Sequence, residues 1–241
     1  MIFQFKAHEF STDDLFFELE KQGILIIQFS QQINLRDLMI EIGGVPVTNN
    51  LSENSVIWDV MPRTEVKNLV RSHGIDDFPL HTDASYESNP PKYVGLFVVK
   101  EDSKGGGLTL VSDSSKILAQ LSHRSLTALK SELRIRVPPE YQKSGDEIEA
   151  PLIWNKKIRY RRELLIEPNE EVIHALDEFE LLAKKFQQKI MLRENSLLIF
   201  ENHRFLHGRT RVLDEQRHLK RIKFNVDRVI ENHWYTQGSP L

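Results

Sequence analysis

The sequence predicts an α+β fold in which helices are scattered around a β-sandwich or jelly roll. Apolar, aromatic or β-branched runs of four to nine residues recur along the chain, punctuated by Gly and Pro, as strands of such folds are. Between these runs lie segments with apolar residues at helical spacing. No composition shift, repeat or low-complexity tract interrupts the 241 residues, so we expect a single domain over residues 1–241.

The first expected helix has signals at both ends. Ser11 or Thr12 can cap its N-terminus, and Gly23 is a stop signal. Further helical segments are expected over residues 34–42, as a pair within 114–132, and at about 169–190. The longest of these is expected because its apolar residues share one helical face: Val172, Leu176, Phe179, Phe186 and Ile190.

Short β-rich runs supply the expected strands, which are residues 24–29, 55–60, 92–100, 108–111, 196–201 and 221–229. Side chains alternate between the two faces of a strand. Around the last run this alternation places four residues on one face: Arg217, Leu219, Arg221 and Lys223. The apolar Leu219 indicates that part of this face is buried.

Composition excludes several classes of protein. The chain has no cysteine, which excludes disulfides, thiolate nucleophiles and metal sites with Cys ligands, so any metal must be held by His, Asp, Glu or carbonyl oxygens. No apolar run approaches the roughly 18 residues of a membrane span, and the first residues lack the pattern of a secretory signal. A net charge of −3 gives no general attraction to nucleic acid. We therefore expect a soluble, cytoplasmic protein that binds neither nucleic acid nor membrane.

The candidate metal site starts from His81 and Asp83, which form an H-x-D pattern. In an extended segment residues i and i+2 project to the same face, so both side chains can ligate one ion. A second imidazole would complete a facial triad that binds divalent first-row metals and leaves coordination positions open. It should come from a distant strand lying beside the first, and His207 is the best candidate, with His203 its competitor. The alternative is that these histidines are ordinary structural residues.

Basic residues and a glycine triplet indicate an anion site that accompanies these histidines. Arg217 and Arg221 follow His207, and the planar fork of arginine binds carboxylates bidentately. The alternative is a solvated basic face, because further Lys and Arg residues lie close by. Gly105–Gly107 precede Thr109, whose hydroxyl can face an anion while glycine lets the backbone pass closely. The alternative here is a tight turn between strands.

Four blocks, in this order, resemble the taurine dioxygenase and clavaminate synthase-like family of Fe(II)/2-oxoglutarate-dependent oxygenases. They are PLHTDASYESNPPKYVGLFVV (residues 79–99), GGLTLVSD (106–113), FENHRFLHGRT (200–210) and RHLKR (217–221). The first block, with IWDV (57–60) ahead of it, and the third block are most similar to the γ-butyrobetaine hydroxylase branch. The resemblance covers roughly residues 55–230 in motif order.

The resemblance implies a double-stranded β-helix core (jelly roll, cupin-like) with iron at its mouth. The residues that match the family's Fe(II) ligands are His81, Asp83 and His207. Thr109 and Arg217 would bind the distal carboxylate of the cosubstrate 2-oxoglutarate, and Arg221 would hold an anionic substrate group or the cosubstrate itself. The family's reaction consumes O2 and releases succinate and CO2. Halogenating relatives lack the carboxylate that Asp83 supplies, so hydroxylation or desaturation is expected.

Substrate and site borders are less sharply defined by the sequence. The basic residues near Arg221 favour a small anionic or zwitterionic substrate, such as an amino acid. Tyr86 and Asn89 are expected to border the pocket, and either Arg159 or Arg162 is a candidate to point inward. Two other functions stay open, a cupin-type metal isomerase or lyase that does not use 2-oxoglutarate and a non-catalytic β-sandwich binding module. The sequence does not set the oligomeric state.

Overall fold

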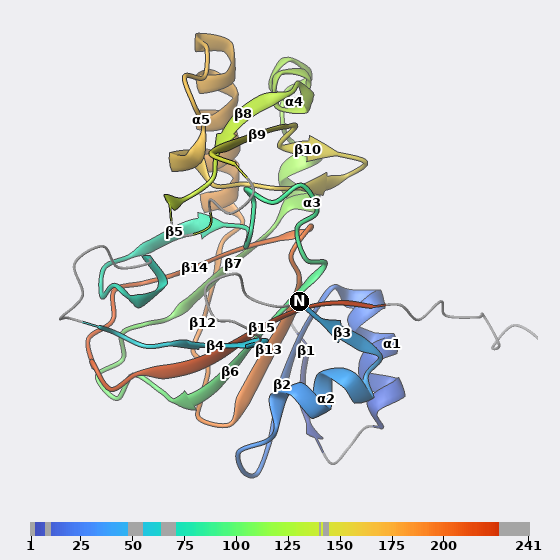
Figure 1. Ribbon diagram of the computed structural model, residues 1–241, viewed down its shortest axis with the longest axis vertical. Coiled ribbons are helices and arrows are strands. Elements are labelled where there is room, and N and C mark those ends of the chain that lie inside the picture. Colours follow the sequence, from blue (N-terminus) through green and yellow to red (C-terminus); the bar gives the residue numbers. More distant parts are fainter. Residues whose placement is uncertain are drawn as a thin grey trace, which may run out of the picture.

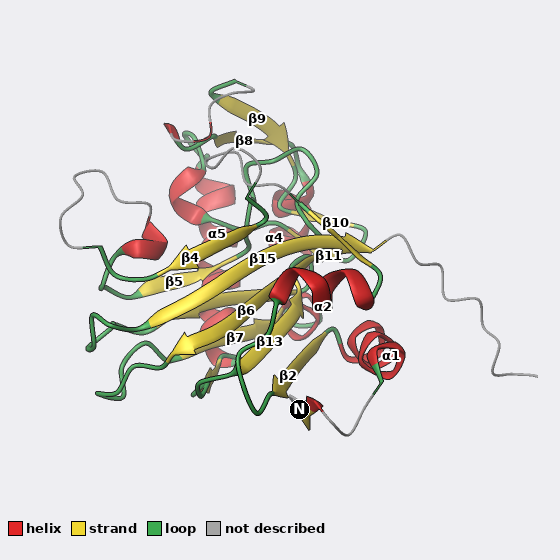
Figure 2. Ribbon diagram, turned by 60° about the horizontal axis from the view of Figure 1, so that its bottom comes forward, coloured by secondary structure: helices red, strands yellow, loops and turns green. Residues whose placement is uncertain are grey.

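A computed structural model of the chain describes residues 3–7, 11–47, 55–63, 71–139, 141 and 145–226. Strands form the centre of the molecule and helices lie around it, which confirms the predicted α+β class (Figures 1 and 2). Within these ranges no helix has both the length and the apolar character needed to cross a membrane.

The strands form two main sheets. The larger sheet runs in the order β1 (Phe3–Lys6), β2 (Ile24–Gln28), β13 (Ser196–Glu201), β6 (Tyr93–Lys100), β15 (His218–Val226) and β3 (Gly44–Pro46), with β4 (Ile57–Val60) also paired to β15. The smaller sheet runs in the order β12 (Gln188–Ile190), β7 (Thr109–Asp113), β14 (Phe205–Arg209) and β5 (Phe78–His81). Neighbours are antiparallel except β1 and β2.

The two sheets pack face to face through one buried apolar cluster. The larger sheet contributes Val94, Leu198 and Phe200, and the smaller sheet contributes Val111 and Phe205. Alternation along β15 divides its side chains between this interior and the outer face. On the interior side lies Leu219, whereas Ile222 and Phe224 belong to a second cluster on the outer face.

Helices α1 (Thr12–Gln22) and α2 (Leu35–Glu41) cover that outer face, and their ends follow from local chemistry. The Ser11 hydroxyl accepts a hydrogen bond from the Asp14 N–H, and the Asp14 carboxylate accepts one from the Ser11 N–H, which forms a capping box. Gly23 closes α1 in the left-handed conformation, at φ 74°. These ends confirm the predicted first helix.

A third layer covers the smaller sheet. It contains α3 (Ser114–Leu118), α4 (His123–Lys130) and α5 (Glu170–Lys185), together with the hairpins of β8 (Leu133–Arg136) with β9 (Glu147–Ala150) and β10 (Ile153–Trp154) with β11 (Lys157–Ile158). The structure also contains two single-turn 3₁₀ helices, Arg71–His73 and Arg162–Leu164.

Two of the predicted boundaries are wrong. The helix expected over 169–190 ends at Lys185, and Gln188–Ile190 instead form β12, which pairs with Val111–Thr109 of β7. No Gly or Pro lies between the helix and this strand. Pairing with the open edge of β7 produces the strand, and the local sequence carries no signal for that tertiary contact. The strand expected over 221–229 begins earlier, at His218, and its last three positions lie outside the described residues. The short strands β1, β3 and β8 to β11 were not predicted.

Candidate metal centre

His81 and His207 face each other across two adjacent strands. His81 is the last residue of β5, and its cross-strand partner in β14 is His207, although 126 positions separate them in the sequence. The strands approach closely at Gly208, where an added Cβ would lie 2.6 Å from the Phe78 carbonyl oxygen. The β14–β5 register shifts between His207 and Arg209, so glycine permits the irregularity that aligns the two imidazoles.

Asp83 completes the cluster that the H-x-D spacing predicted. Its Oδ1 lies 3.7 Å from His81 Nε2 and 3.6 Å from His207 Nε2. One candidate ligand atom from each residue lies within 4.8 Å of the others, and all three residues are buried. The competitor His203 is elsewhere, with its Nε2 3.0 Å from the Pro90 carbonyl oxygen. The structure therefore brings together the three residues that the sequence proposed, with His207 and not His203 as the distal histidine.

The protonation states of the cluster suit a cation. Burial and the neighbouring His207 lower the pKa of His81 to about 4, so its imidazole is neutral at neutral pH. Burial alone would raise the pKa of Asp83, but the Arg221 guanidinium and the nearby imidazoles of His207 and His81 hold it well below its usual range. The Oδ2 atom of this carboxylate has no hydrogen-bond partner among the described residues. Two imidazoles and an ionised carboxylate with a free oxygen fit a divalent first-row metal ion.

Asn202 fixes the backbone that carries Asp83. Its Oδ1 accepts a hydrogen bond from the Asp83 N–H at 2.8 Å, and its Nδ2 donates to the carbonyls of Asp83 and Pro91, both at 3.0 Å. The His81 ring is oriented in a similar way, with Nδ1 2.9 Å from the Pro79 carbonyl oxygen. Asn202 was not predicted as a site residue, although it lies in the third of the blocks quoted above.

We expect Asn202→Ala to destabilise the protein, because each buried group left unpaired costs about 1–3 kcal/mol. Urea unfolding measures the loss. Asn225→Ala is the matched control, since it removes one hydrogen bond, accepted from the exposed Lys92 N–H at 2.9 Å. Equal stability losses in the two variants would contradict the positioning role of Asn202.

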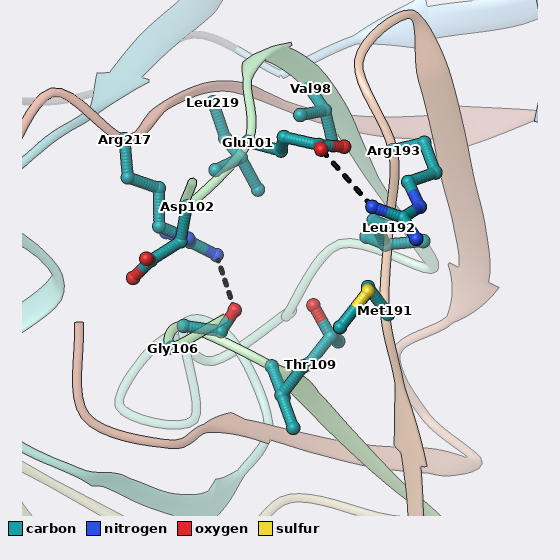
Figure 3. A pocket seen from close by; sticks show the side chains of 12 residues that line it. Val98, Glu101, Asp102, Gly106, Thr109, Met191, Leu192, Arg193, Arg217 and Leu219 are labelled. Carbon is teal, nitrogen blue, oxygen red and sulfur yellow. Dashed lines mark hydrogen bonds and ion pairs between the residues drawn. The ribbon is translucent and has the colours of Figure 1, made fainter. Parts of the chain in front are cut away.

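The cluster opens into a hollow of about 460 Å³, which we call the arginine hollow. Its walls include His81, His207, Thr109, Arg209, Arg217, Leu219 and Arg221. Thr109, Arg217 and Leu219 also line a further hollow, which Figure 3 shows. The structure thus places the predicted anion-binding residues Thr109 and Arg217 together, in a space shared with the two histidines.

Arg217 is a buried cation that makes no ion pair with the described residues, although the Asp102 carboxylate attracts it from beyond ion-pair distance. It is 5% exposed, and its guanidinium donates to the Gly107 carbonyl at 3.1 Å, the bond that the dashed line from Arg217 marks in Figure 3. In the part of the chain that the structure describes, no carboxylate lies within ion-pair distance of it. Burial, and secondarily Arg209, lowers the pKa of Arg217 to about 9. Such a charge is costly unless an anion joins it, so the arginine hollow is suited to a carboxylate.

The glycine triplet makes room for this side chain. Gly107 has φ +58°, and a Cβ on it would lie 2.5 Å from Arg217 Nε. Gly105 also has a positive φ, of +79°. The segment is therefore a turn, and its backbone at Gly107 passes close to the Arg217 side chain.

Arg209 and Arg221 are not part of a solvated basic face, whereas Arg211 is exposed. Arg209 is buried and donates to the carbonyls of Ser72, Gly74 and Asp76 at 3.2, 2.7 and 2.9 Å, which holds that loop against the site. Arg221 is buried and donates to Asp83 Oδ1 at 3.1 Å.

A second hollow, of about 370 Å³, meets the cluster from another side. We call it the tyrosine hollow, and its walls include His81, Asp83, Tyr86, Tyr141, Arg161, Arg221 and Lys223. Tyr86 was expected there, whereas Asn89 is not among the residues that line it.

The sequence left open whether Arg159 or Arg162 points inward, and in the structure it is their neighbour Arg161 that lines the tyrosine hollow. Arg159 instead donates to the carbonyls of Glu87 and Ser88, at 2.8 and 3.2 Å. Arg162 pairs with two carboxylates of α5, those of Asp177 and Glu180. The sequence could not separate these neighbours, because β11 ends at Ile158 and alternation no longer applies.

Comparisons with known proteins agree with this geometry. A family model described as taurine catabolism dioxygenase TauD, TfdA family, matches residues 17–223. A search of curated proteins found no match. Among solved structures, an asparagine oxygenase in complex with Fe(II), 2S,3S-3-hydroxyasparagine and succinate is 19% identical, with a TM-score of 0.75, covering 89% of this chain and 77% of that chain.

The non-heme iron oxygenase OrfP in complex with Fe and alpha-ketoglutaric acid is 17% identical, with a TM-score of 0.71, covering 90% of this chain and 80% of that chain. A mutant of OrfP in complex with (3S)-hydroxy-L-Arg gives a TM-score of 0.72 at 17% identity, covering 90% and 79%. At these identities the likeness shows a shared fold.

Proposed function

The chain belongs to the taurine catabolism dioxygenase TauD/TfdA family, and from this premise we propose that it is a non-haem Fe(II)/2-oxoglutarate-dependent oxygenase that hydroxylates or desaturates a small anionic or zwitterionic molecule, such as an amino acid. The observation that carries the proposal is that residues of the His81–Asp83–His207 cluster line two hollows, each of which also contains buried cationic side chains. A metal site alone would suit many enzymes, whereas a metal site between two anion-binding spaces suits a reaction of two anions.

In this proposal His81, Asp83 and His207 hold Fe(II). When bound together with 2-oxoglutarate, the metal supplies the activation of O2, so that one oxygen atom enters succinate and the other is available to oxidise the substrate. In hydroxylation, substrate, O2 and 2-oxoglutarate give hydroxylated substrate, succinate and CO2. The neutral His81 imidazole and the ionised Asp83 carboxylate are ready for this role without loss of a proton.

Arg217 and Thr109 hold the distal carboxylate of 2-oxoglutarate in the arginine hollow. The buried guanidinium gains the counter-charge that it lacks, and a planar fork fixes the orientation of the carboxylate. A cupin-type isomerase or lyase would have no use for this cation, so the residue favours the oxygenase over that alternative.

We expect Gly107→Ala to weaken 2-oxoglutarate binding without loss of the metal. An added Cβ would displace the Arg217 side chain, and the positive φ would strain the new residue. An anaerobic titration with 2-oxoglutarate measures the effect. Gly105→Ala is the control, because it also has a positive φ but nothing lies within 4 Å of its added Cβ. Equal affinities in the two variants would contradict the account.

The tyrosine hollow is the place proposed for the substrate, with Arg221 holding an anionic group beside Asp83. The structural neighbours support an amino-acid substrate, since complexes of those proteins contain hydroxylated asparagine and arginine. The facing sheets support a double-stranded β-helix in a single domain. A cytoplasmic location stays a prediction from the sequence.

Substrate-coupled release of succinate tests the proposed function. Purified protein with Fe(II), 2-oxoglutarate and O2 is screened against amino acids and betaines, with succinate and product measured together. We expect succinate release that requires both Fe(II) and O2 and rises with one class of anionic or zwitterionic compound. Turnover of neutral or cationic compounds alone would contradict the anion-binding role of the tyrosine hollow.

A further inference from the structure

The tyrosine hollow carries more positive charge than one anionic group requires. Arg71 and Arg161 share a single carboxylate, that of Glu163, at 2.7 and 2.9 Å. Arg221 is paired with Asp83 at 3.1 Å. The side-chain ammonium of Lys223 makes no ion pair or hydrogen bond within the part of the chain that the structure describes. A bound divalent metal would add further positive charge next to Asp83, so the excess persists in the working enzyme.

Lys223 follows from the alternation of β15. It lies two residues beyond Arg221 on the same strand, and both line the tyrosine hollow. A two-residue step along a strand spans about 6.6 Å. The same alternation directs Lys220 to the opposite face, where Ile222 packs in the outer cluster. The strand therefore presents two cations to a single space beside the metal ligands.

The surroundings of Lys223 suit an incoming anion. Burial lowers the pKa of the Lys223 ammonium, although Asp83 and Glu87 attract it, so a closer counter-charge would stabilise the cation. Burial also raises the pKa of Glu87, while Lys223 lowers it. Neither carboxylate is within ion-pair distance of Lys223.

We propose that Lys223 is a specificity-determining residue, and that the substrate carries two acidic groups, one held by Arg221 and the other by Lys223. The inference rests on the proposed function and narrows its substrate class to short dicarboxylic amino acids. Both cations line this one hollow, so a short molecule with two carboxylates can present one to each of them. An uncharged amide in place of the second carboxylate would leave Lys223 without a counter-charge, so the hollow discriminates between the acid and its amide.

Binding of matched acid and amide pairs tests this inference. The protein is loaded anaerobically with Fe(II) and saturating 2-oxoglutarate. The cosubstrate then occupies the arginine hollow, so the added acids cannot bind there. Calorimetry then measures the affinity for L-aspartate against L-asparagine, L-glutamate against L-glutamine, and L-2-aminoadipate. We expect the best acid to bind at least about tenfold more tightly than its amide, which corresponds to one charge-assisted contact.

Variants on strand β15 test whether Lys223 is responsible for the preference for the acid over its amide. Lys223→Gln is expected to reduce the preference for the acid to about twofold or less while 2-oxoglutarate affinity is kept. Lys223→Arg should keep the preference, which guards against a purely structural effect. Lys220→Gln, on the outer face, should change neither affinity.

Three results would overturn the inference: a preference for the amide, no binding of any acid at millimolar concentration, or an acid preference that survives Lys223→Gln. Failure of the proposed function is a separate observation, because the wild-type protein would then not bind Fe(II) and 2-oxoglutarate at the loading step.

Discussion

Asp83→Ala is expected to abolish Fe(II)-dependent succinate formation and to destabilise the protein by about 3–5 kcal/mol. The carboxylate is both a proposed metal ligand and the partner of the buried Arg221, at 3.1 Å. Its removal leaves a buried guanidinium without a counter-charge, which is the costly way to break such a pair. Urea unfolding of the metal-free protein measures the stability effect separately from the chemistry.

A second ion pair provides the control for this variant. Arg204 binds both oxygens of Asp113, at 3.0 and 2.8 Å, away from the metal centre and with more exposure to solvent. Asp113→Ala should therefore cost less stability and keep the succinate-forming activity of the protein that remains folded. If Asp83→Ala kept its activity, or lost no more stability than Asp113→Ala, the assigned role of Asp83 would be wrong.

Arg217→Met is expected to weaken 2-oxoglutarate binding by about 2–5 kcal/mol, a factor of roughly 30 to 5,000, and to leave Fe(II) binding intact. The same change should not destabilise the free protein. The Arg217 side chain has one hydrogen bond, to the Gly107 carbonyl, and no ion pair among the described residues. Methionine therefore removes a desolvated charge that only the more distant Asp102 offsets. Loss of affinity without loss of stability is the signature of a residue that is kept for its ligand.

Arg209→Met is the control that distinguishes a loss of 2-oxoglutarate affinity from a loss of folding stability. Arg209 is also buried, but it donates to three carbonyls of the loop that carries Ser72. Its replacement leaves those groups unpaired, so it should destabilise the protein. Equal destabilisation by the two variants, or unchanged 2-oxoglutarate affinity in Arg217→Met, would contradict the proposed anchor.

The parts of the site that could be predicted from sequence are those governed by short spacing. Arg221 and Lys223 share a face of β15 because they are two residues apart. The H-x-D spacing also brought Asp83 to His81, although β5 ends at His81 and Asp83 lies in the turn that follows. The first helix was predictable because Ser11 and Gly23 act locally. The pairing of His81 with His207 needed one further assumption, that two distant strands lie together, and the structure confirms it.

Residues whose roles depend on tertiary placement were not predictable in the same way. Asn202 was missed because its three hydrogen bonds reach a loop more than a hundred positions away. Arg161 was missed because no periodicity survives beyond the short strand β11. The end of α5 was missed because pairing with β7, and not a helix stop signal, converts residues 188–190 to a strand.

The central claim is that His81, Asp83 and His207 hold Fe(II) beside a bound 2-oxoglutarate. An anaerobic titration of the protein with Fe(II) and then 2-oxoglutarate tests it most directly, with visible absorption as the readout. We expect a weak metal-to-ligand charge-transfer band that saturates with 2-oxoglutarate in the wild-type protein and is absent in His207→Ala. Absence of the band in the wild-type protein, or an undiminished band in His207→Ala, would contradict the account.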